Sequence, residues 1–111
     1  MVEKEELMEA LGKWAAKLDD ESYKERFKGF EKTLQFDFSD QDFHLLMVFK
    51  DETCTLEEGS VDAPDIVIST ASDVIMGITN REISPTKAFM GGKLKAKGNM
   101  KDMLKIQMLM K

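Results

Sequence analysis

The chain contains few of the residues that staple small secreted proteins or bind metals. Its 111 residues include one cysteine, Cys54, and one histidine, His44. A single cysteine excludes an intramolecular disulfide, which fits a reducing compartment. A lone histidine excludes a metal site built from several histidines, so we predict neither a metal nor a cofactor.

The sequence also lacks long apolar runs. None approaches the ~20 residues that an α-helix needs to cross a bilayer. The N-terminus, Met-Val-Glu-Lys-Glu-Glu, is acidic and has no apolar stretch of the signal-peptide kind. The C-terminus, Leu-Met-Lys, is not the peroxisomal Ser-Lys-Leu address. We therefore expect a cytoplasmic protein that forms a single domain over residues 1–111.

Positive charge is scarce over most of the chain. The net charge is −5, which argues against a nucleic-acid binder. Residues 1–83 contain 9 Lys or Arg against 20 Asp or Glu, whereas residues 84–111 contain 7 Lys and one Asp. Two interpretations stay open. The two charge sets attract each other across one surface, or the basic segment meets an anionic head group or membrane surface.

No catalytic motif withstands inspection. Cys54 and His44 would form a nucleophile pair only if the fold happened to bring them together. The segment Gly91–Leu94 lacks the Ser or Thr and the upstream glycine of a phosphate-binding loop. Three acids suggest calcium, but the glycine and the closing Glu of an EF-hand are missing, so we interpret them as acids of a hairpin turn: Asp37, Asp40 and Asp42.

Hydrophobic periodicity predicts a mixture of helices and strands. Apolar residues recur at helical spacing in residues 2–18, and a shorter helix is expected at about 21–28. Further helices are expected from about residue 72 to Gly77, after Ser84, and after Asn99. Alternation or β-branched residues predict strands at 33–38, 43–49, 53–58, 65–70 and 93–98, with the first three in an antiparallel meander.

Several side-chain orientations follow from these patterns. Either Thr70 or Ser72 is expected to cap the helix that follows it. The short helix after Ser84 should direct Ala88, Phe89 and Met90 inward. In the last strand Leu94 and Ala96 should face the core, while the outward residues suit a sheet edge: Lys93, Lys95 and Lys97.

The last helix carries more apolar surface than one sheet face can cover. On a helical wheel the apolar residues fill an arc of about 200°, roughly twice the stripe of an ordinary surface helix. They are Ile106, Met110, Met103, Met100, Leu104 and Met108, and the opposite side holds Lys101, Lys105, Asp102 and Leu109. Either methionine fills gaps in an ordinary core, or the excess surface meets a ligand, a membrane or another chain.

Residues 84–100, Ser-Pro-Thr-Lys-Ala-Phe-Met-Gly-Gly-Lys-Leu-Lys-Ala-Lys-Gly-Asn-Met, resemble a sequence block of the sterol carrier protein two family. The order of helices and strands is similar to that family over essentially the whole chain. The resemblance implies an α+β fold. Its five-stranded, mostly antiparallel sheet has helices on one face and an apolar tunnel between the two layers. It also implies a non-enzymatic carrier of fatty acids, fatty acyl-CoA, phospholipids or sterols.

On this reading the tunnel would be lined by residues from the strands and the later helices. The predicted ligand contacts are Phe43, Leu45, Phe49, Ile75, Ile78, Phe89, Met90, Met100, Met103, Leu104 and Met108. The candidates for an anionic head group are Arg26, Lys93, Lys95 and Lys97.

The partners expected from this reading are a lipid or fatty acyl ligand and a transient anionic membrane surface. We expect a monomer that binds no nucleic acid. The alternative is an interaction module whose last helix docks on a partner enzyme or on a second copy of the chain. An enzyme is the least supported hypothesis.

Overall fold

Five strands form one sheet in the order β3-β2-β1-β4-β5 in the computed structural model, which describes residues 2–110. Strand β1 pairs with β4 in parallel, and the other neighbours are antiparallel. The predicted meander is thus confirmed, and the later strands extend the sheet beyond β1. The strands are β1 Lys32–Phe38, β2 His44–Lys50, β3 Thr53–Glu58, β4 Ile66–Thr70 and β5 Leu94–Lys97.

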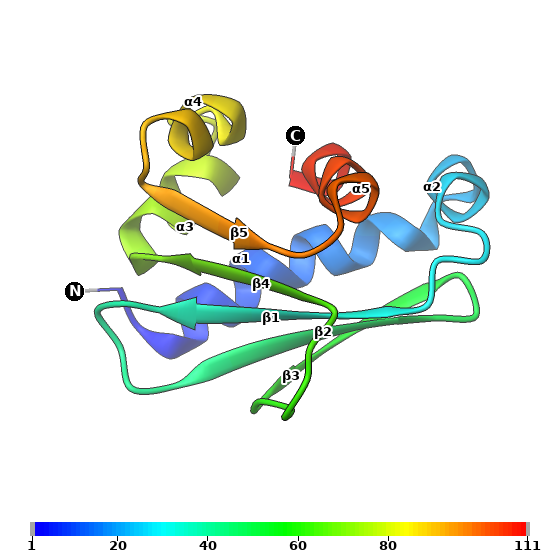
Figure 1. The fold of residues 1–111 in the computed structure, drawn as a ribbon, viewed down its shortest axis with the longest axis horizontal. Helices are drawn as coiled ribbons and strands as arrows, with labels where there is room; N and C mark the ends of the chain where they lie inside the picture. The colour runs from blue at the N-terminus through cyan, green and yellow to red at the C-terminus, as the bar shows by residue number, and fades with distance from the viewer. Residues whose placement is uncertain (1, 111) are drawn as a thin grey trace.

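The helices lie together on one side of this sheet (Figure 1). They are α1 Lys4–Ala16, the 3₁₀ helix η1 Lys17–Asp19, α2 Glu21–Arg26, α3 Ser72–Thr79, α4 Pro85–Met90 and α5 Met100–Met110. Within residues 2–110, no helix is both long enough and apolar enough to cross a membrane.

The core lies between the central strands and α1. Leu34 and Phe36 of β1 are fully buried, as are Leu7 and Leu11 of α1. Trp14 packs on Phe36 with 6.4 Å between the ring centroids. The alternation in β1 and the helical spacing in α1 therefore face each other, as the sequence pattern predicts.

A cap from outside the helix starts α3. The N-cap residue, Ala71, offers no side-chain hydrogen bond, so the predicted caps, Thr70 and Ser72, are both wrong. Instead the carboxylate of Asp40 accepts from the Ser72 backbone N–H at 2.9 Å and from its hydroxyl at 2.5 Å. The β1–β2 turn thus supplies the acceptor, which no pattern around residue 72 could reveal.

Replacing Asp40 with alanine should lower the free energy of unfolding by about 1 kcal/mol at neutral pH, because α3 loses this acceptor. The hydrogen bond from the Ser72 side chain lowers the pKa of Asp40. Its stabilisation is therefore present above the unfolded-state pKa and lost as the pH falls through the lower folded-state pKa.

Urea denaturation of the wild type and of Asp40→Ala tests this, at pH 7 and at steps below about pH 4. The difference between the two proteins should shrink in acid. Asp42→Ala removes an exposed acid from the same turn and serves as the control. A pH-independent difference, or an equal loss in the control, would contradict the capping role.

Helix α4 begins where the sequence predicts, but not all of its side chains have the predicted orientation. The Ser84 side chain accepts from the Lys87 backbone N–H at 3.4 Å, and Pro85 takes the first helical position. Ala88 is buried and Met90 is 80% exposed, so the prediction that Met90 points inward is wrong, whereas Phe89 is 47% exposed and is covered on one side. Such a short helix buries only a narrow stripe, which Ala88 occupies.

Strand β5 confirms the predicted alternation at the sheet edge. Leu94 is buried and Ala96 is half-buried. Lys93, Lys95 and Lys97 are exposed. Because β5 is the last strand in the sheet order, these lysines lie along a free edge.

Candidate functional site

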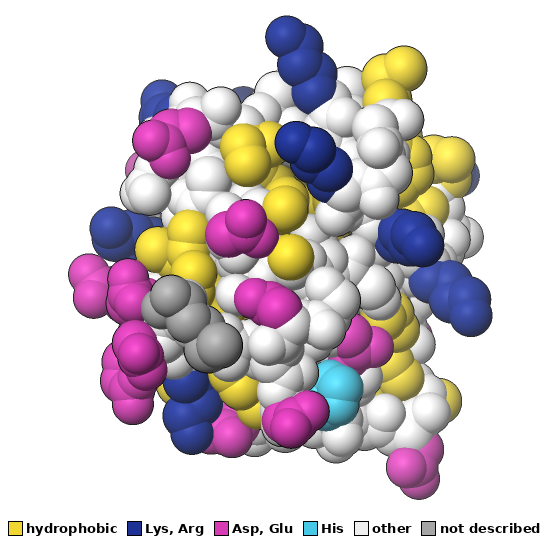
Figure 2. Space-filling model, turned by 90° about the vertical axis from the view of Figure 1, so that its left-hand side faces the viewer, with side chains coloured by type: hydrophobic (Ala, Val, Ile, Leu, Met, Phe, Trp, Pro, Cys, Tyr) yellow, Lys and Arg dark blue, Asp and Glu magenta, His cyan; other side chains and the backbone are white. Residues whose placement is uncertain are grey.

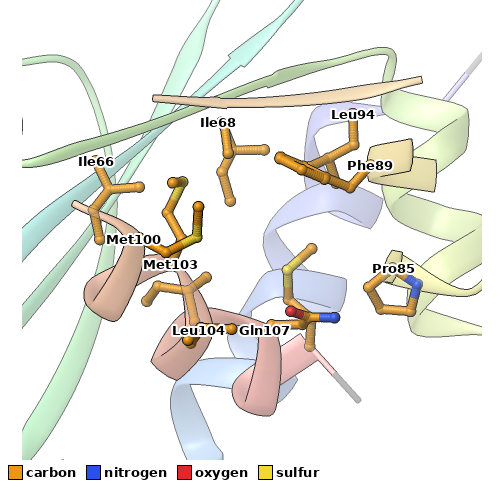
Figure 3. A pocket seen from close by; sticks show the side chains of 12 residues that line it. Ile66, Ile68, Pro85, Phe89, Leu94, Met100, Met103, Leu104 and Gln107 are labelled. Atoms are coloured by element: carbon orange, nitrogen blue, oxygen red, sulfur yellow. The ribbon is translucent and has the colours of Figure 1, made fainter. Parts of the chain in front are cut away.

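An apolar cavity of about 90 Å³ lies between strands β4 and β5 and helices α4 and α5. Figure 3 shows side chains converging on it from the strands, from α5 and from α4. Its lining residues are Ile66, Ile68, Pro85, Phe89, Leu94, Ala96, Met100, Met103, Leu104, Ile106, Gln107 and Met110.

The lining has one polar side chain, Gln107. Its amide donates to the Thr86 hydroxyl and so links α5 to α4. Among residues 2–110, no buried side-chain nitrogen or oxygen lacks a hydrogen-bond partner. The cavity therefore suits an aliphatic ligand, and its methionines can adapt to different shapes because the side chain is unbranched and flexible.

The cavity is small for a lipid. At about 90 Å³ it is below the ~150 Å³ of an engineered cavity that binds benzene. Pockets for drug-sized ligands are typically ~300–1,000 Å³. A long acyl chain would fit only if a wall moved.

Helix α5 is rotated relative to the prediction from its wheel. Its buried residues are Ile106, Leu109 and Met110, so the buried face is centred about 100° from the middle of the predicted apolar arc. Leu109, which lies opposite the apolar arc on the wheel, is fully buried. The other side of the helix leaves Met100 65% and Leu104 57% exposed.

Polar contacts on the side opposite the apolar arc explain this rotation. The ammonium of Lys105 donates to the carbonyl of Arg26 and lies 5.7 Å from the ring centroid of Phe27. Asp102 forms an ion pair with Lys32, with 3.4 Å between Oδ2 and Nζ. These contacts turn the charged side of α5 towards α2 and β1. Hydrophobic periodicity cannot predict them, because it takes only apolar residues into account.

The C-terminal end of α5 is held by Lys17. Its ammonium donates to the carbonyl of Leu109 at 2.8 Å. Burial, and then the nearby Arg81 charge, lower the pKa of Lys17. A cation here interacts favourably with the carbonyls that end a helix.

Four of the predicted ligand contacts line the cavity: Phe89, Met100, Met103 and Leu104. The others do not line it: Phe43, Leu45, Phe49, Ile75, Ile78, Met90 and Met108. Leu45, Phe49, Ile75 and Ile78 are buried in the core, and Met90 points to solvent.

Phe49 illustrates why the core residues lie elsewhere. Its ring stacks on Phe27 at 5.6 Å between centroids and meets Phe30 edge-on at 5.2 Å. This aromatic cluster brings together β2 and the end of α2, whereas the cavity adjoins β4 and β5. The sequence showed that Phe49 faces the helices but not which helix covers it.

Eight lining residues were not predicted from the sequence. They are Ile66, Ile68, Pro85, Leu94, Ala96, Ile106, Gln107 and Met110. A signal for the strand residues was present, because Ile68 lies opposite Ala96 in the β4–β5 register and both alternate towards the helices.

The head-group candidates also lie outside the cavity lining. Lys93, Lys95 and Lys97 alternate with Leu94 and Ala96 and so point away from the cavity. The Arg26 guanidinium lies 5.7 Å from the ring centroid of Tyr23 on α2.

The cysteine and the histidine do not form a catalytic pair. Cys54 lies opposite Phe49 in the β2–β3 register, and His44 is five residues from Phe49 along β2, which separates them by about 16 Å. His44 Nδ1 lies 2.6 Å from Asp37 Oδ1. Burial raises the pKa of Cys54 to about 12, so the thiol is neutral at physiological pH.

Across the described chain, residues 2–110, no group of three or more His, Cys, Asp or Glu side chains is arranged to hold a metal ion.

Some similar proteins are much longer than this chain. The chain is 43% identical over 49 residues to hydroxysteroid dehydrogenase-like protein 2 of Bos taurus, a match that covers 44% of this chain and 12% of the relative. The fold also matches part of the sec-alkylsulfatase Pisa1 from Pseudomonas sp. That match has a TM-score of 0.66 and 20% identity, and covers 78% of this chain and 14% of the sulfatase.

Other structures match over most of their length. The crystal structure of Sterol Carrier Protein 2 Like 2 from Aedes aegypti has a TM-score of 0.72 at 12% identity, covering 92% of this chain and 94% of that one. The solution structure of palmitated SCP2L2 from Aedes aegypti has a TM-score of 0.60 at 13% identity, covering 86% and 92%. At these identities the likeness concerns the fold.

The family model of the SCP-2 sterol transfer family matches residues 11–111. The match runs from the second half of α1 through α5 and includes the whole sheet and the sequence block at residues 84–100. The chain belongs to the SCP-2 sterol transfer family.

Proposed function

We propose that the protein is a non-enzymatic carrier that binds the acyl chain of a fatty acid or a related lipid in the cavity between β4, β5, α4 and α5. The observation that carries the proposal is the chemistry of the lining, which is apolar except for Gln107. The palmitated relative of the same fold supports a saturated acyl chain as the ligand class. Cytoplasm remains the proposed location.

The energetics favour binding of moderate strength. Burying a 16-carbon chain yields on the order of 12 kcal/mol gross, at about 0.8 kcal/mol per methylene. The loss of translational freedom and the ordering of the ligand remove much of this, which leaves an affinity on the order of micromolar.

Helix α4 is the wall that would move to admit such a chain. Only Ala88 of its residues is buried. Its side-chain link to α5 is the hydrogen bond between Thr86 and Gln107. By contrast α5 is fixed on its other side by Lys17, Lys32 and Arg26. Displacing α4 therefore disrupts fewer polar side-chain contacts than displacing α5.

Native mass spectrometry of protein purified without detergent tests the function directly, because a bound lipid adds its own mass. Palmitate should also raise the melting temperature by several degrees. A free concentration of 100 times Kd adds about 2.7 kcal/mol to the stability of the folded state. Hexanoate shares the carboxylate but lacks the long chain, so it is the matched control ligand.

Amide hydrogen exchange of the palmitate complex locates the ligand. Protection should change most in α4 and the first half of α5, and least in the β1–β3 meander. Failure of palmitate to alter either the melting temperature or exchange, with no lipid in the purified protein, would contradict the proposal. An equal effect of hexanoate would indicate carboxylate binding in place of chain burial.

A further inference from the structure

An open groove adjoins the cavity at the C-terminal end of α5. It has a volume of about 430 Å³ and lies between the α3–α4 connection, helix α4 and Met110. Pro85 and Met110 line both the groove and the cavity, so the two spaces share a wall. A volume of this size is within the ~300–1,000 Å³ of small-molecule sites. The groove therefore has room for the part of a ligand that the small cavity cannot hold.

One hydrogen bond spans the boundary between the two spaces. Gln107 lines the cavity and Thr86 lines the groove, and the Gln107 amide donates to the Thr86 hydroxyl. In Figure 3 the Gln107 amide points towards the side of the cavity on which Pro85 lies. Displacement of α4 by an acyl chain would break this hydrogen bond and join the groove to the cavity.

Hydrogen-bond donors predominate in the groove. Its lining includes two cations, Arg81 and Lys87. It also includes the hydroxyls of Ser84 and Thr86, which accept from the Lys87 backbone N–H and from the Gln107 amide. Each of these hydroxyls can still donate its own hydrogen. An ionised carboxylate or phosphate accepts hydrogen bonds, so an anionic group is the chemistry that these donors suit.

Positive charge exceeds negative charge in the groove. Neither Arg81 nor Lys87 takes part in a salt bridge among residues 2–110, and Glu82 is the one acid among the described residues of the lining. Burial, and then the Arg81 charge, lower the pKa of Lys17, so a third cation lies near Arg81. Figure 2 views the molecule from the end that carries α3 and α4. Lys and Arg side chains lie in its upper part beside hydrophobic ones, while acidic side chains gather mainly at the left and bottom.

The backbone of the α3–α4 connection holds Arg81 at the edge of the groove. Its φ of 62° is left-handed, which is uncommon for residues other than glycine. The Arg81 N–H donates to the Ile78 carbonyl at 3.1 Å, and the N–H groups of Glu82 and Ile83 donate to the Gly77 carbonyl at 2.8 and 3.0 Å. These hydrogen bonds fix the turn before any ligand arrives, which lowers the entropy cost of binding.

We propose that the groove binds the anionic head group, a carboxylate or a phosphate, of the lipid whose chain enters the cavity, with Arg81 as the principal ionic partner. This inference rests on the proposed carrier function. The guanidinium suits either group, because its planar fork of donors matches two oxygens at once. The chain would then run from Met110, at the end of α5, towards Met100 at its start, with its methyl end farthest from the charged groove.

Other cations near the helices fit this role less well. The four head-group candidates from the sequence line neither the cavity nor the groove: Arg26, Lys93, Lys95 and Lys97. Lys17 already donates to the carbonyl of Leu109. Arg81 is therefore the arginine whose groove shares a wall with the cavity.

Calorimetric titration with three ligands of one chain length tests the head-group site. Dodecanoate, dodecyl phosphate and dodecanol differ only in the head group, which is a carboxylate, a phosphate or a neutral hydroxyl. Arg81→Gln should weaken binding of the anionic ligand about fivefold, the effect of losing an exposed ion pair, and should leave dodecanol binding nearly unchanged. Lys87→Gln should show the same selectivity with a smaller loss. The anion that loses more affinity identifies the head group that the groove prefers, and the loss should shrink as salt rises.

The matched control is Arg26→Gln, which makes the same change at an exposed arginine on α2. It should retain the wild-type affinity for all three ligands. An equal loss of anion binding in Arg26→Gln would mean that net charge, not the groove, attracts the ligand and would overturn the proposal. Equal losses of dodecanol and of both anions in Arg81→Gln would also overturn it, because the variant would then act on the chain site.

The wild type separates this site from the carrier function. If it binds none of the three ligands and palmitate leaves its melting temperature unchanged, the carrier function fails and the head-group site fails with it. If it binds all three, and neither Arg81→Gln nor Lys87→Gln alters any affinity, the carrier function stands and the head-group site alone is overturned.

Discussion

Replacing Phe49 with alanine should lower the free energy of unfolding by about 3–5 kcal/mol, the cost of truncating a fully packed aromatic residue. Phe49 is 2% exposed and contacts the rings of Phe27 and Phe30. Loss of the ring leaves a void beneath the end of α2. It also removes aromatic contacts worth about 0.5–1.5 kcal/mol each. Urea denaturation at neutral pH measures the change.

Phe89→Ala is the matched control, since it removes the same ring from a residue that is 47% exposed and that lines the cavity. It should cost less than about 1 kcal/mol in stability and should weaken palmitate binding. Calorimetric titration measures the binding of the folded protein. A small stability loss in Phe49→Ala, or a specific loss of palmitate affinity in that variant alone, would mean that Phe49 belongs to the ligand site after all.

Filling the cavity should weaken ligand binding. Ala96 of β5 is half-buried and faces the space between the sheet and α5. Ala96→Met adds the atoms Cγ, Sδ and Cε to a cavity of about 90 Å³. We expect palmitate affinity to fall at least tenfold, which corresponds to about 1.4 kcal/mol. The stability of the ligand-free protein should change by less than about 1.5 kcal/mol, because a flexible side chain enters an existing void.

Ala16→Met, at the exposed end of α1, introduces the same side chain away from the cavity and serves as the control. Isothermal titration of both variants with palmitate, together with their melting temperatures, gives the comparison. Wild-type affinity in Ala96→Met would place the ligand elsewhere. An equal loss in Ala16→Met would show that the added methionine acts in some other way than by filling the cavity.

Exposed apolar side chains line the cavity because the two sides of α5 have different roles. Its Ile106, Leu109 and Met110 complete the core. Its Met100 and Leu104 face the cavity and the solvent. This division supplies the excess apolar surface that the wheel indicates. The proposed ligand binding can therefore be tested with variants of these same side chains.

The lining residues of the cavity could be predicted where the composition of a single helix indicated them. The methionine-rich helix contributes Met100 and Met103 to the cavity, and its composition alone predicts a ligand-lining role. The strand contributions were assigned to the wrong strand. Leu45 and Phe49 of β2 alternate as regularly as Ile66 and Ile68 of β4, so periodicity shows that both pairs face the helices but not which helix covers each.

What the sequence determined by itself was the set of elements, their order and their local ends. Ser84 with Pro85 starts α4, Gly92 with its positive φ of 78° ends it, and Asn99 Oδ1 accepts from the Lys101 N–H at 2.8 Å to start α5. These features depend on residues close together in the chain. They follow from local geometry and the hydrogen bonds that helix ends require.

Only the tertiary structure decided the rotation of α5, the remote cap on α3 and the position of the cavity. Asp40 reaches Ser72 across 32 positions, and Lys105 reaches the carbonyl of Arg26 across 79. Such contacts form because the sheet places distant segments side by side. Local periodicity therefore indicates that α5 has surplus apolar surface, while the packing partners determine where that surplus lies.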